Sequence, residues 1–251
     1  MIKKDKMKIV STRCIAKDTI EMVLENQFIS GIAVPGQFLH IQVGKHILRR
    51  PISIADCNKE LNQITILFKI NGVGTDELAN YQQGEYLDVL GPLGNGFTTD
   101  GESKSTVLLI GGGIGVPPLY YLGKTLKENG INIVTILGFQ QKDNVFYEQQ
   151  FQELGETFIV TDNGSYGHKG FVTDVIDQVG RFDCYYSCGP IPMLKALTAK
   201  LKGKKGFISL EERMGCGIGA CFACVLPTKD GTSYKKICKD GPVFQAEEVT
   251  L

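Results

Sequence analysis

Four of the eight cysteines in this chain lie within 23 residues, at Cys216, Cys221, Cys224 and Cys238. The first three have the C-x4-C-x2-C spacing of a loop that wraps a plant-type 2Fe–2S cluster and supplies thiolates from several sides. Glycine and alanine fill most positions between them, which lets the backbone point N–H groups at the sulfides. The pattern predicts a 2Fe–2S cluster with these four ligands, and for Cys238 the support is its spacing and two nearby lysines.

Two other interpretations of these cysteines stay open, a structural zinc site and plain core thiols. Zinc sites usually use two close pairs of cysteines, whereas thirteen residues separate Cys224 from Cys238. A 2Fe–2S cluster passes single electrons and breaks no bonds, so it needs a neighbouring group that does bond chemistry. The remaining scattered cysteines, Cys14, Cys57 and Cys184, are interpreted as core thiols.

Two segments among the first hundred residues could bind phosphate. In Arg50-Pro51-Ile52-Ser53 a guanidinium, which binds phosphate bidentately, stands close to a hydroxyl. In the other segment, a glycine turn leads through Gly74 into a helix that we expect Thr75 to cap, leaving N–H groups for a pyrophosphate. Taken alone, each segment also has a structural explanation, as an exposed edge-strand arginine and as an ordinary helix cap.

A strand, a glycine turn and a helix follow one another between Thr106 and Lys127, which is the context of a dinucleotide site. The third glycine of the usual fingerprint is replaced, but the turn still lets phosphate approach the backbone, and proline fits an early helix position. A second strand ends in Cys188-Gly-Pro at the same edge of the expected sheet. The predicted nucleotide-binding residues are Gly111, Gly112, Gly113, Ile114, Gly115, Cys188, Gly189, Pro190 and Met193.

Two patterns of secondary structure must position these segments. Up to Phe97, short β-type runs between turn residues predict an antiparallel barrel or sandwich, with strands at 8–14, 19–24, 37–43, 52–55, 63–70 and 86–90 and a helix at 76–81. From residue 106, strands and helices alternate, which predicts a doubly wound parallel α/β sheet, with strands at 106–110, 132–138, 157–161 and 183–187 and helices at 118–127, 146–154, 172–179 and 192–202.

The alternation is expected to stop after Lys205. We therefore expect three regions: a barrel at 1–100, an α/β domain at 101–205 and a small cluster subdomain at 206–251, with the first boundary in the polar run 98–105.

Composition excludes several function classes. Lys plus Arg and Asp plus Glu both number 27, so the net charge is zero and general binding of nucleic acid or anionic membrane is not expected. No secretory signal or membrane-spanning segment is readable, which favours a cytoplasmic protein.

The three histidines, His40, His46 and His168, lack metal-ligand spacing and are interpreted as structural. Hydrolase motifs are also absent from the sequence.

The order of these segments resembles the ferredoxin-NADP reductase superfamily over nearly the whole chain. The resemblance implies that the barrel binds FAD, with Arg50 on the FAD phosphates and Ser53 near the reactive ring nitrogen. It also implies further FAD contacts from Leu67, Phe68 and Lys69. Ile52 stands where that superfamily usually has tyrosine, so aromatic packing on the flavin is lost at this point.

For the α/β domain, the same resemblance implies a nicotinamide nucleotide whose ring is positioned by Cys188 during hydride transfer. The segment after the strand at 132–138 contains no arginine that could hold a 2′-phosphate. The lack of an arginine in this segment favours NAD over NADP.

Within the superfamily, the segments Glu211–Cys224, Arg49–Ser53 and Cys188–Met193 closely resemble the electron transfer subunits of dihydroorotate dehydrogenase B. This resemblance implies an oxidoreductase subunit of pyrimidine biosynthesis that receives electrons through its 2Fe–2S cluster from the FMN of a separate catalytic subunit. FAD would then deliver hydride to NAD+. It also implies a heterotetramer with two copies of each subunit, docked near the cluster.

Two alternatives to that family remain. One is a related flavin and 2Fe–2S subunit serving a ferredoxin:NADP transhydrogenase, a sulfide dehydrogenase or a hydrogenase. The other, from a different functional class, is a zinc-stapled binding module.

Overall fold

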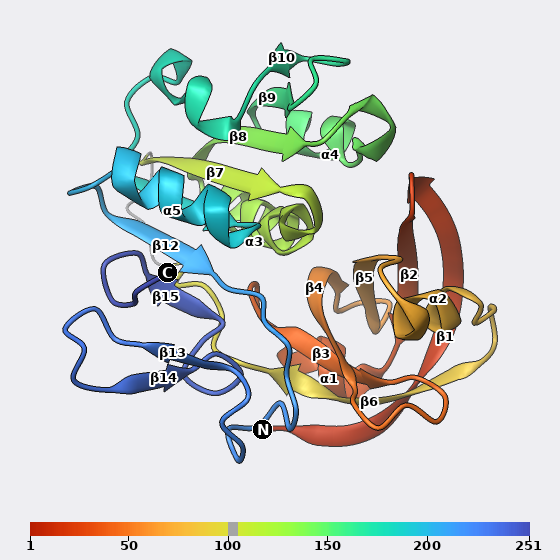
Figure 1. The fold of residues 1–251 in the computed structure, drawn as a ribbon. Helices are drawn as coiled ribbons and strands as arrows, with labels where there is room; N and C mark the ends of the chain where they lie inside the picture. Colours follow the sequence, from red (N-terminus) through yellow and green to blue (C-terminus); the bar gives the residue numbers. More distant parts are fainter. Residues whose placement is uncertain (100–104) are drawn as a thin grey trace.

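The computed structural model describes residues 1–99 and 105–251. Six antiparallel strands close into a barrel with the order β1-β2-β5-β4-β3-β6 (Figure 1). Their bounds are β1 Lys3–Ala16, β2 Thr19–Glu25, β3 Phe38–Gln42, β4 Arg50–Asn58, β5 Gln63–Lys69 and β6 Tyr86–Leu93. All six predicted strands are confirmed, and the barrel alternative is the one that forms.

Two short helices connect strands of the barrel, α1 Gln27–Ile32 and α2 Val73–Ala79. The sequence analysis did not predict α1, because six residues that include Gly31 carry almost no helical periodicity. The Asn26 side chain nevertheless caps this helix by accepting a hydrogen bond from the Ile29 N–H at 2.9 Å. Helix α2 begins three residues before the predicted start.

Alternation along β3 decides which side chains fill the barrel. Leu39 and Ile41 point inward and pack with Ile54 and Ile66 in the barrel core. Phe38 belongs instead to the cluster of apolar side chains that also contains residues of the α/β sheet and of the C-terminal segment. The outer face of β3 is therefore an interface within the chain.

A seven-stranded sheet forms the second part, in the order β10-β9-β8-β7-β11-β12-β15. Every pairing in it is parallel except that of β15. The bounds are β7 Thr106–Gly112, β8 Asn132–Phe139, β9 Glu156–Thr161, β10 His168–Lys169, β11 Cys184–Cys188, β12 Gly206–Ser209 and β15 Val243–Gln245. The predicted doubly wound sheet is confirmed.

Helices cover both faces of this sheet. Helices α3 Val116–Glu128 and α4 Glu148–Gln152 pack on one face, and α5 Ile191–Lys200 packs on the other. Helix α3 lies between the sheet and the barrel (Figure 1). It holds the barrel through a hydrogen bond from the Tyr121 hydroxyl to the Ala33 carbonyl at 3.0 Å and through an ion pair of Lys124 with Asp56 at 2.7 Å.

Two expectations about the sheet were wrong. The predicted helix at 172–179 consists of two 3-10 turns, Val172–Asp174 and Ile176–Gln178, because this β-branched run is a poor helix former and the Asp174 carboxylate accepts a hydrogen bond from the Phe171 N–H. The strand pattern also continues past Lys205, since β12 pairs in parallel with β11. Where one domain ends and the next begins stays a prediction.

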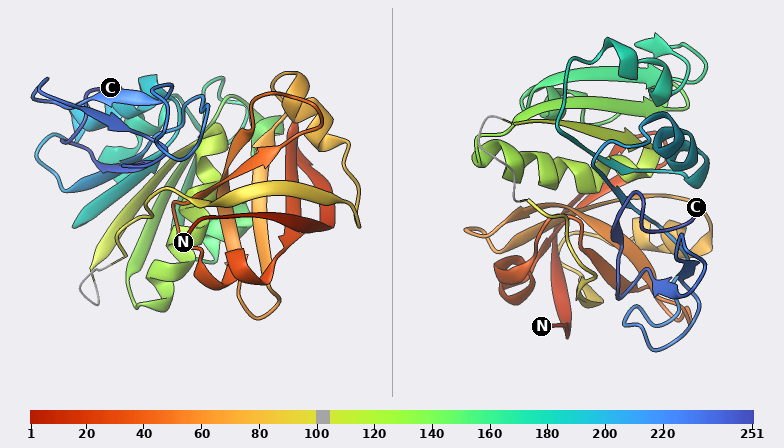
Figure 2. Two further views of the ribbon diagram at one scale, coloured as in Figure 1. Left: turned by 90° about the horizontal axis from the view of Figure 1, so that it is seen from below. Right: turned by 90° about the vertical axis from the view of Figure 1, so that its left-hand side faces the viewer.

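The C-terminal segment packs on both the sheet and the barrel (Figure 2). It contains the hairpin β13 Val225–Pro227 and β14 Tyr234–Lys236 and then supplies β15 to the sheet. Asn95, just after β6, donates side-chain hydrogen bonds to the carbonyls of Lys239 and Asp240 at 3.2 and 3.0 Å. The cysteine loop is thus fixed against the barrel.

Of the three scattered cysteines, Cys184 is buried and Cys57 is half-buried, but Cys14 is exposed. The prediction that Cys14 is a core thiol is wrong, because its side chain is exposed near the end of β1. None of the described helices is long and apolar enough to cross a membrane.

Candidate functional site

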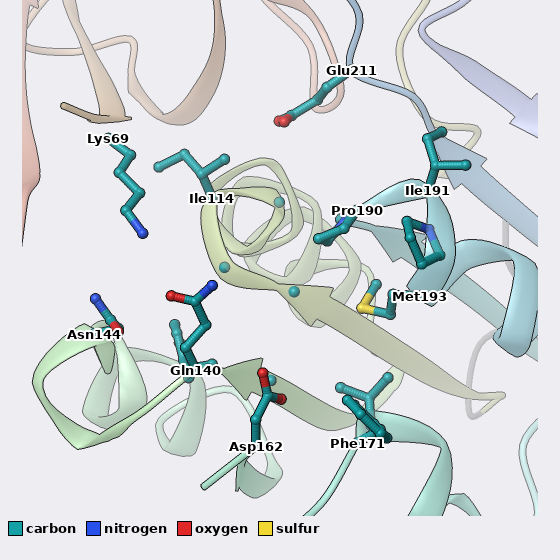
Figure 3. Close-up of a pocket in the computed structure, with 18 of the residues that line it drawn as sticks. Lys69, Ile114, Gln140, Asn144, Asp162, Phe171, Pro190, Ile191, Met193 and Glu211 are labelled. Atoms are coloured by element: carbon teal, nitrogen blue, oxygen red, sulfur yellow. The ribbon is translucent and has the colours of Figure 1, made fainter. Parts of the chain in front are cut away.

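A cavity of about 620 Å³ opens at the carboxyl ends of the parallel strands. It lies where β7 and β11, the first and fifth strands of the sheet in chain order, are neighbours, which is the switch point where nucleotides bind in doubly wound sheets. Gly112–Gly115 at the end of β7 and Gly189–Met193 after β11 both line it, and Lys69 of the barrel also contributes to the wall (Figure 3). The two predicted turns therefore meet at one site.

Close packing explains why glycine occupies the turn after β7. A Cβ atom at Gly115 would lie 2.4 Å from the main-chain carbonyl carbon of Cys188, and one at Gly112 would lie 2.5 Å from the Met193 sulfur. Gly113 has a φ of +53°, which favours glycine. Gly111 does not line the cavity but packs against Val116 at the start of α3.

Three charged side chains line the cavity, Lys69, Asp162 and Glu211, and they approach it from different sides (Figure 3). Glu211 is exposed to solvent, yet the surrounding protein atoms desolvate its carboxyl group and raise its pKa to about 7. A carboxyl group with this pKa exchanges its proton near neutral pH.

The sequence analysis missed Asp162, Glu211 and also Gln140. Gln140 and Asp162 directly follow the carboxyl ends of β8 and β9, so the rule for switch-point sites could have found them. No comparable pattern in the sequence indicated Glu211, because its position at the cavity depends on β12, a strand that was not predicted. Lys142 points elsewhere, with its ammonium 5.8 Å from the centre of the Tyr166 ring.

Neither Cys188 nor Ser53 is among the residues that line the cavity. The Cys188 side chain is fully buried, and this burial raises the pKa of its thiol well above the usual value. Its main chain does reach the site, because it contacts Gly115 and precedes Gly189. Ser53 lies on β4 opposite Phe38 and is half-buried. The roles assigned to these two side chains remain predictions.

Arg50 and Gly74 lie against each other at one end of the barrel. A Cβ atom at Gly74 would be 2.1 Å from a guanidinium nitrogen of Arg50, so only glycine admits the arginine here. Thr75 does not cap α2 as predicted, because the helix starts earlier and Gly72 is its N-cap. The Thr75 hydroxyl instead closes the preceding turn, accepting from the Asn71 N–H at 2.8 Å and donating to the Gly72 carbonyl at 3.1 Å.

Three other residues expected near FAD have buried side chains. Ile52 and Phe68 pack in the barrel core, and Leu67 packs with the apolar residues around α3. Pro51 is half-buried on β4. Of the segment Leu67–Lys69, only Lys69 lines the cavity.

The four cysteines of the C-terminal segment are arranged as two pairs. The thiol of Cys216 contacts that of Cys221, and the thiol of Cys238 contacts that of Cys224. Cys224 and Cys238 are buried, whereas Cys216 and Cys221 are partly exposed. Among residues 1–99 and 105–251, no three His, Cys, Asp or Glu side chains surround one point as a single metal ion would require.

Backbone N–H groups point at the sulfur atoms of this loop. The Cys221 N–H donates to Cys216 Sγ at 3.3 Å, and the Gly219 N–H donates to Cys238 Sγ at 3.1 Å. Burial alone would raise the pKa of Cys216, but the N–H groups of Cys221 and Ile218 outweigh it and lower the pKa to about 6. For Cys238, burial and the neighbouring Cys224 thiol raise the pKa to about 12.

Comparison with known proteins identifies the family. Electron transfer subunits of dihydroorotate dehydrogenase B (NAD(+)) from Bacillus cereus strain G9842 and Bacillus anthracis strain A0248 are each 53% identical to this chain over 259 aligned residues, covering all of both proteins. The chain belongs to this family. The model of the iron-sulfur cluster binding domain of dihydroorotate dehydrogenase B matches residues 211–250 of this family member.

Solved structures agree with the fold of a dihydroorotate dehydrogenase B electron transfer subunit. A chain of an NADH-dependent reduced ferredoxin-NADP oxidoreductase superposes with a TM-score of 0.87 and 35% identity, covering 97% of this chain and 89% of that one. A ferredoxin NADP+ reductase from Neisseria gonorrhoeae gives a TM-score of 0.67 over 79% of this chain and 90% of that one, at 14% identity, and so shares the fold alone.

The residues present fit the cofactors of such a subunit. A 2Fe–2S cluster needs two thiolates on each iron, which corresponds to the two cysteine pairs, and the N–H groups directed at sulfur are typical of cluster loops. The contact of Arg50 with Gly74 fits a phosphate-binding turn. The switch-point cavity fits a nicotinamide nucleotide.

Proposed function

We propose that this chain transfers electrons from a separate FMN-containing catalytic subunit, which oxidises dihydroorotate to orotate, to NAD+. One observation carries the proposal: a single short segment joins the nucleotide cavity, the cluster loop and the barrel. Glu211 lines the nucleotide cavity, Cys216 begins the cluster loop five residues later, and Gly217 packs on His40 of the barrel. Such proximity is what electron transfer between bound groups requires.

Each site has a defined task in this proposal. Cys216, Cys221, Cys224 and Cys238 hold the iron, and Arg50 with the turn at Gly74 and Thr75 holds the FAD phosphates. Bound FAD supplies the exchange between single-electron and two-electron transfer. Ser53 lies on β4, the strand that begins at Arg50, and is assigned to the flavin ring.

The nucleotide turn binds and orients NAD. Gly112–Gly115 let its diphosphate approach the backbone at the start of α3, and Lys69 supplies positive charge to the same cavity. Asp162 and the absence of any arginine among the cavity-lining residues disfavour a 2′-phosphate, so NAD is preferred to NADP. Gly189, Pro190 and Met193 form the wall for the nicotinamide end, with the Cys188 main chain behind it.

Electrons and protons balance across the two subunits. Dihydroorotate loses two electrons and two protons to become orotate. NAD+ takes both electrons and one proton as hydride, and the second proton goes to solvent.

The partner and its stoichiometry are part of the proposal. Every motif read in this chain is assigned to a cofactor, which supports a separate subunit for dihydroorotate. We propose a heterotetramer with two copies of each subunit, located in the cytoplasm and docked at the cluster loop. Ile218 and Phe222 on that loop are 48% and 74% exposed, as an apolar docking surface requires.

The decisive experiment is co-purification with the catalytic subunit followed by an assay of dihydroorotate-dependent NAD+ reduction. The complex is expected to reduce NAD+, and this chain alone is expected to oxidise NADH with an artificial acceptor but not to use dihydroorotate. A complex with intact FAD and cluster that fails to reduce NAD+ would contradict the proposal.

A second candidate has one observation in its favour. The 35% identity and the TM-score of 0.87 to a chain of a ferredoxin-NADP oxidoreductase support a subunit whose partner exchanges electrons with ferredoxin. Reduction of ferredoxin, but not of NAD+ by dihydroorotate, would select this candidate.

A further inference from the structure

His40 lies on the outer face of the barrel where the C-terminal segment covers it. Its neighbours Leu39 and Ile41 point into the barrel core, so His40 shares the outward face with Phe38. Its side chain is fully buried. A Cβ atom at Gly217 would lie 2.6 Å from His40 Nδ1, which means that the imidazole packs directly on the residue after Cys216.

The His40 imidazole is held in place, but its hydrogen-bonding capacity is not satisfied. Both ring nitrogens are buried without a hydrogen-bond partner of normal geometry, although one of them must carry a hydrogen. An unpaired buried donor costs about 1–3 kcal/mol, so such groups usually have a partner. The Arg49 guanidinium fixes the main chain at this point by donating to the His40 and Asp88 carbonyls, both at 3.1 Å.

The surroundings keep this ring neutral. Burial lowers the pKa of His40 to about 4, and the positive charge of Arg49 acts in the same direction, while the nearby Arg49 carbonyl offsets only part of the effect. A neutral imidazole offers one N–H donor and one acceptor nitrogen. On its Gly217 side the ring can therefore donate this hydrogen bond to an acceptor held by the cysteine loop.

We propose that the His40 imidazole donates a hydrogen bond to a sulfur atom of the 2Fe–2S cluster and thereby raises the cluster's reduction potential. This inference rests on the proposed function, because it requires the cluster. Hydrogen bonds to cluster sulfur stabilise the more negative, reduced state. His40 thus links the flavin-binding barrel to the cluster.

The experiment uses the purified protein with its cluster and FAD, grown with ¹⁵N-histidine and reduced. Pulsed electron paramagnetic resonance is expected to detect one weakly coupled histidine nitrogen at the cluster. The chain has three histidines, so His46→Gln and His168→Gln are matched controls that keep the coupling, whereas His40→Leu loses it.

A redox titration of the cluster gives a second readout. In His40→Leu the ratio of reduced to oxidised cluster at a fixed ambient potential is expected to fall threefold to tenfold, and tenfold corresponds to about 59 mV for one electron. His40→Gln, which retains a donor, should fall between this variant and the wild type.

The outcomes separate the two proposals. A wild-type protein with a normal cluster signal but no histidine coupling would overturn the role of His40 and leave the proposed function intact. If the reduced protein shows no 2Fe–2S signal at all, the proposed function fails as well. Should His40→Leu not retain its cluster, the labelled wild type and His40→Gln decide the question.

Discussion

The Tyr147 hydroxyl donates a hydrogen bond to Oε2 of Glu21 at 2.6 Å, which joins the α/β part of the chain to the barrel. Both side chains are buried, and the other carboxylate oxygen of Glu21 accepts from Arg13 at 2.6 Å. Burial, followed by the bond to Glu21, raises the pKa of Tyr147, so its hydroxyl stays protonated and remains a donor.

Tyr147→Phe is expected to destabilise the protein by about 1–3 kcal/mol, because it leaves a buried carboxylate oxygen unpaired. Thermal unfolding should show a melting temperature lower by about 2–4 °C for each kcal/mol. Tyr166→Phe is the control, since its hydroxyl meets Glu148 at the exposed surface at 3.0 Å. Equal melting temperatures for Tyr147→Phe and the wild type would show that this bond adds nothing to stability.

Cys238→Ser tests the cluster ligand that lies outside the C-x4-C-x2-C loop. Because Cys238 pairs with the Cys224 thiol and accepts a hydrogen bond from the Gly219 N–H, its loss is expected to remove most iron and sulfide from the purified chain. Metal analysis and visible absorption measure this directly. Cys14→Ser, at an exposed position far from the cluster loop in the sequence, should retain its full content of iron and sulfide. Undiminished iron in Cys238→Ser would mean that another residue supplies the fourth ligand.

Gly115→Ala is expected to weaken NAD binding at least tenfold. The added Cβ would lie 2.4 Å from the Cys188 carbonyl, so the turn that approaches the nucleotide must shift. Titration with NAD measures the dissociation constant. Gly31→Ala is the matched control, because a Cβ there meets nothing within 4 Å. The proposed location of the nucleotide would be wrong if both variants bound NAD equally.

Glu211 is expected to make stability depend on pH. Its pKa is raised to about 7 from 4.5 by desolvation, so the folded protein prefers the protonated form, and this preference is lost as pH rises through 7. The free energy of unfolding of the wild type should therefore fall relative to Glu211→Gln between pH 5 and 8. Denaturant titrations at several pH values measure it, with Glu212→Gln as control. Parallel pH profiles for wild type and Glu211→Gln would rule out the shift.

Phe222→Ser is expected to weaken assembly with the catalytic subunit at least tenfold. The ring is 74% exposed on the cluster loop, and the Lys236 ammonium lies 4.3 Å from its centre. Sedimentation or surface-based binding measures the dissociation constant. Leu61→Ser, which removes a comparably exposed apolar side chain from the turn between β4 and β5, should leave it unchanged. Unaltered binding by Phe222→Ser would place the docking surface elsewhere.

Much of the fold and part of the site could be predicted because their causes are local. Strand alternation and turn residues indicated all six barrel strands. The glycine content of the segment Gly112–Gly115 predicted its turn. The spacing of Cys216, Cys221 and Cys224 likewise depends only on neighbouring residues. Such features need no knowledge of distant contacts.

Other features depend on pairings between distant residues. His40 gives no sign of a special role in its own strand, and its importance arises only from contact with Gly217. Glu211 reaches the cavity because β12 aligns with β11. Thr75 was predicted to cap helix α2, but Gly72 is its N-cap, because the helix begins at Val73, earlier than the residue preferences suggest.

The packing of Phe38 and Leu93 with Met214, Ile237 and Phe244 imposes an order on biosynthesis. The ribosome completes the barrel strands long before it makes the residues that cover their outer face. At about 5–20 residues per second, the ribosome needs about 6–30 seconds to make the roughly 120–150 residues from Leu93 to the side chains that cover this apolar face. Newly made chains are therefore exposed to chaperones and to aggregation until the C-terminal segment docks on the barrel.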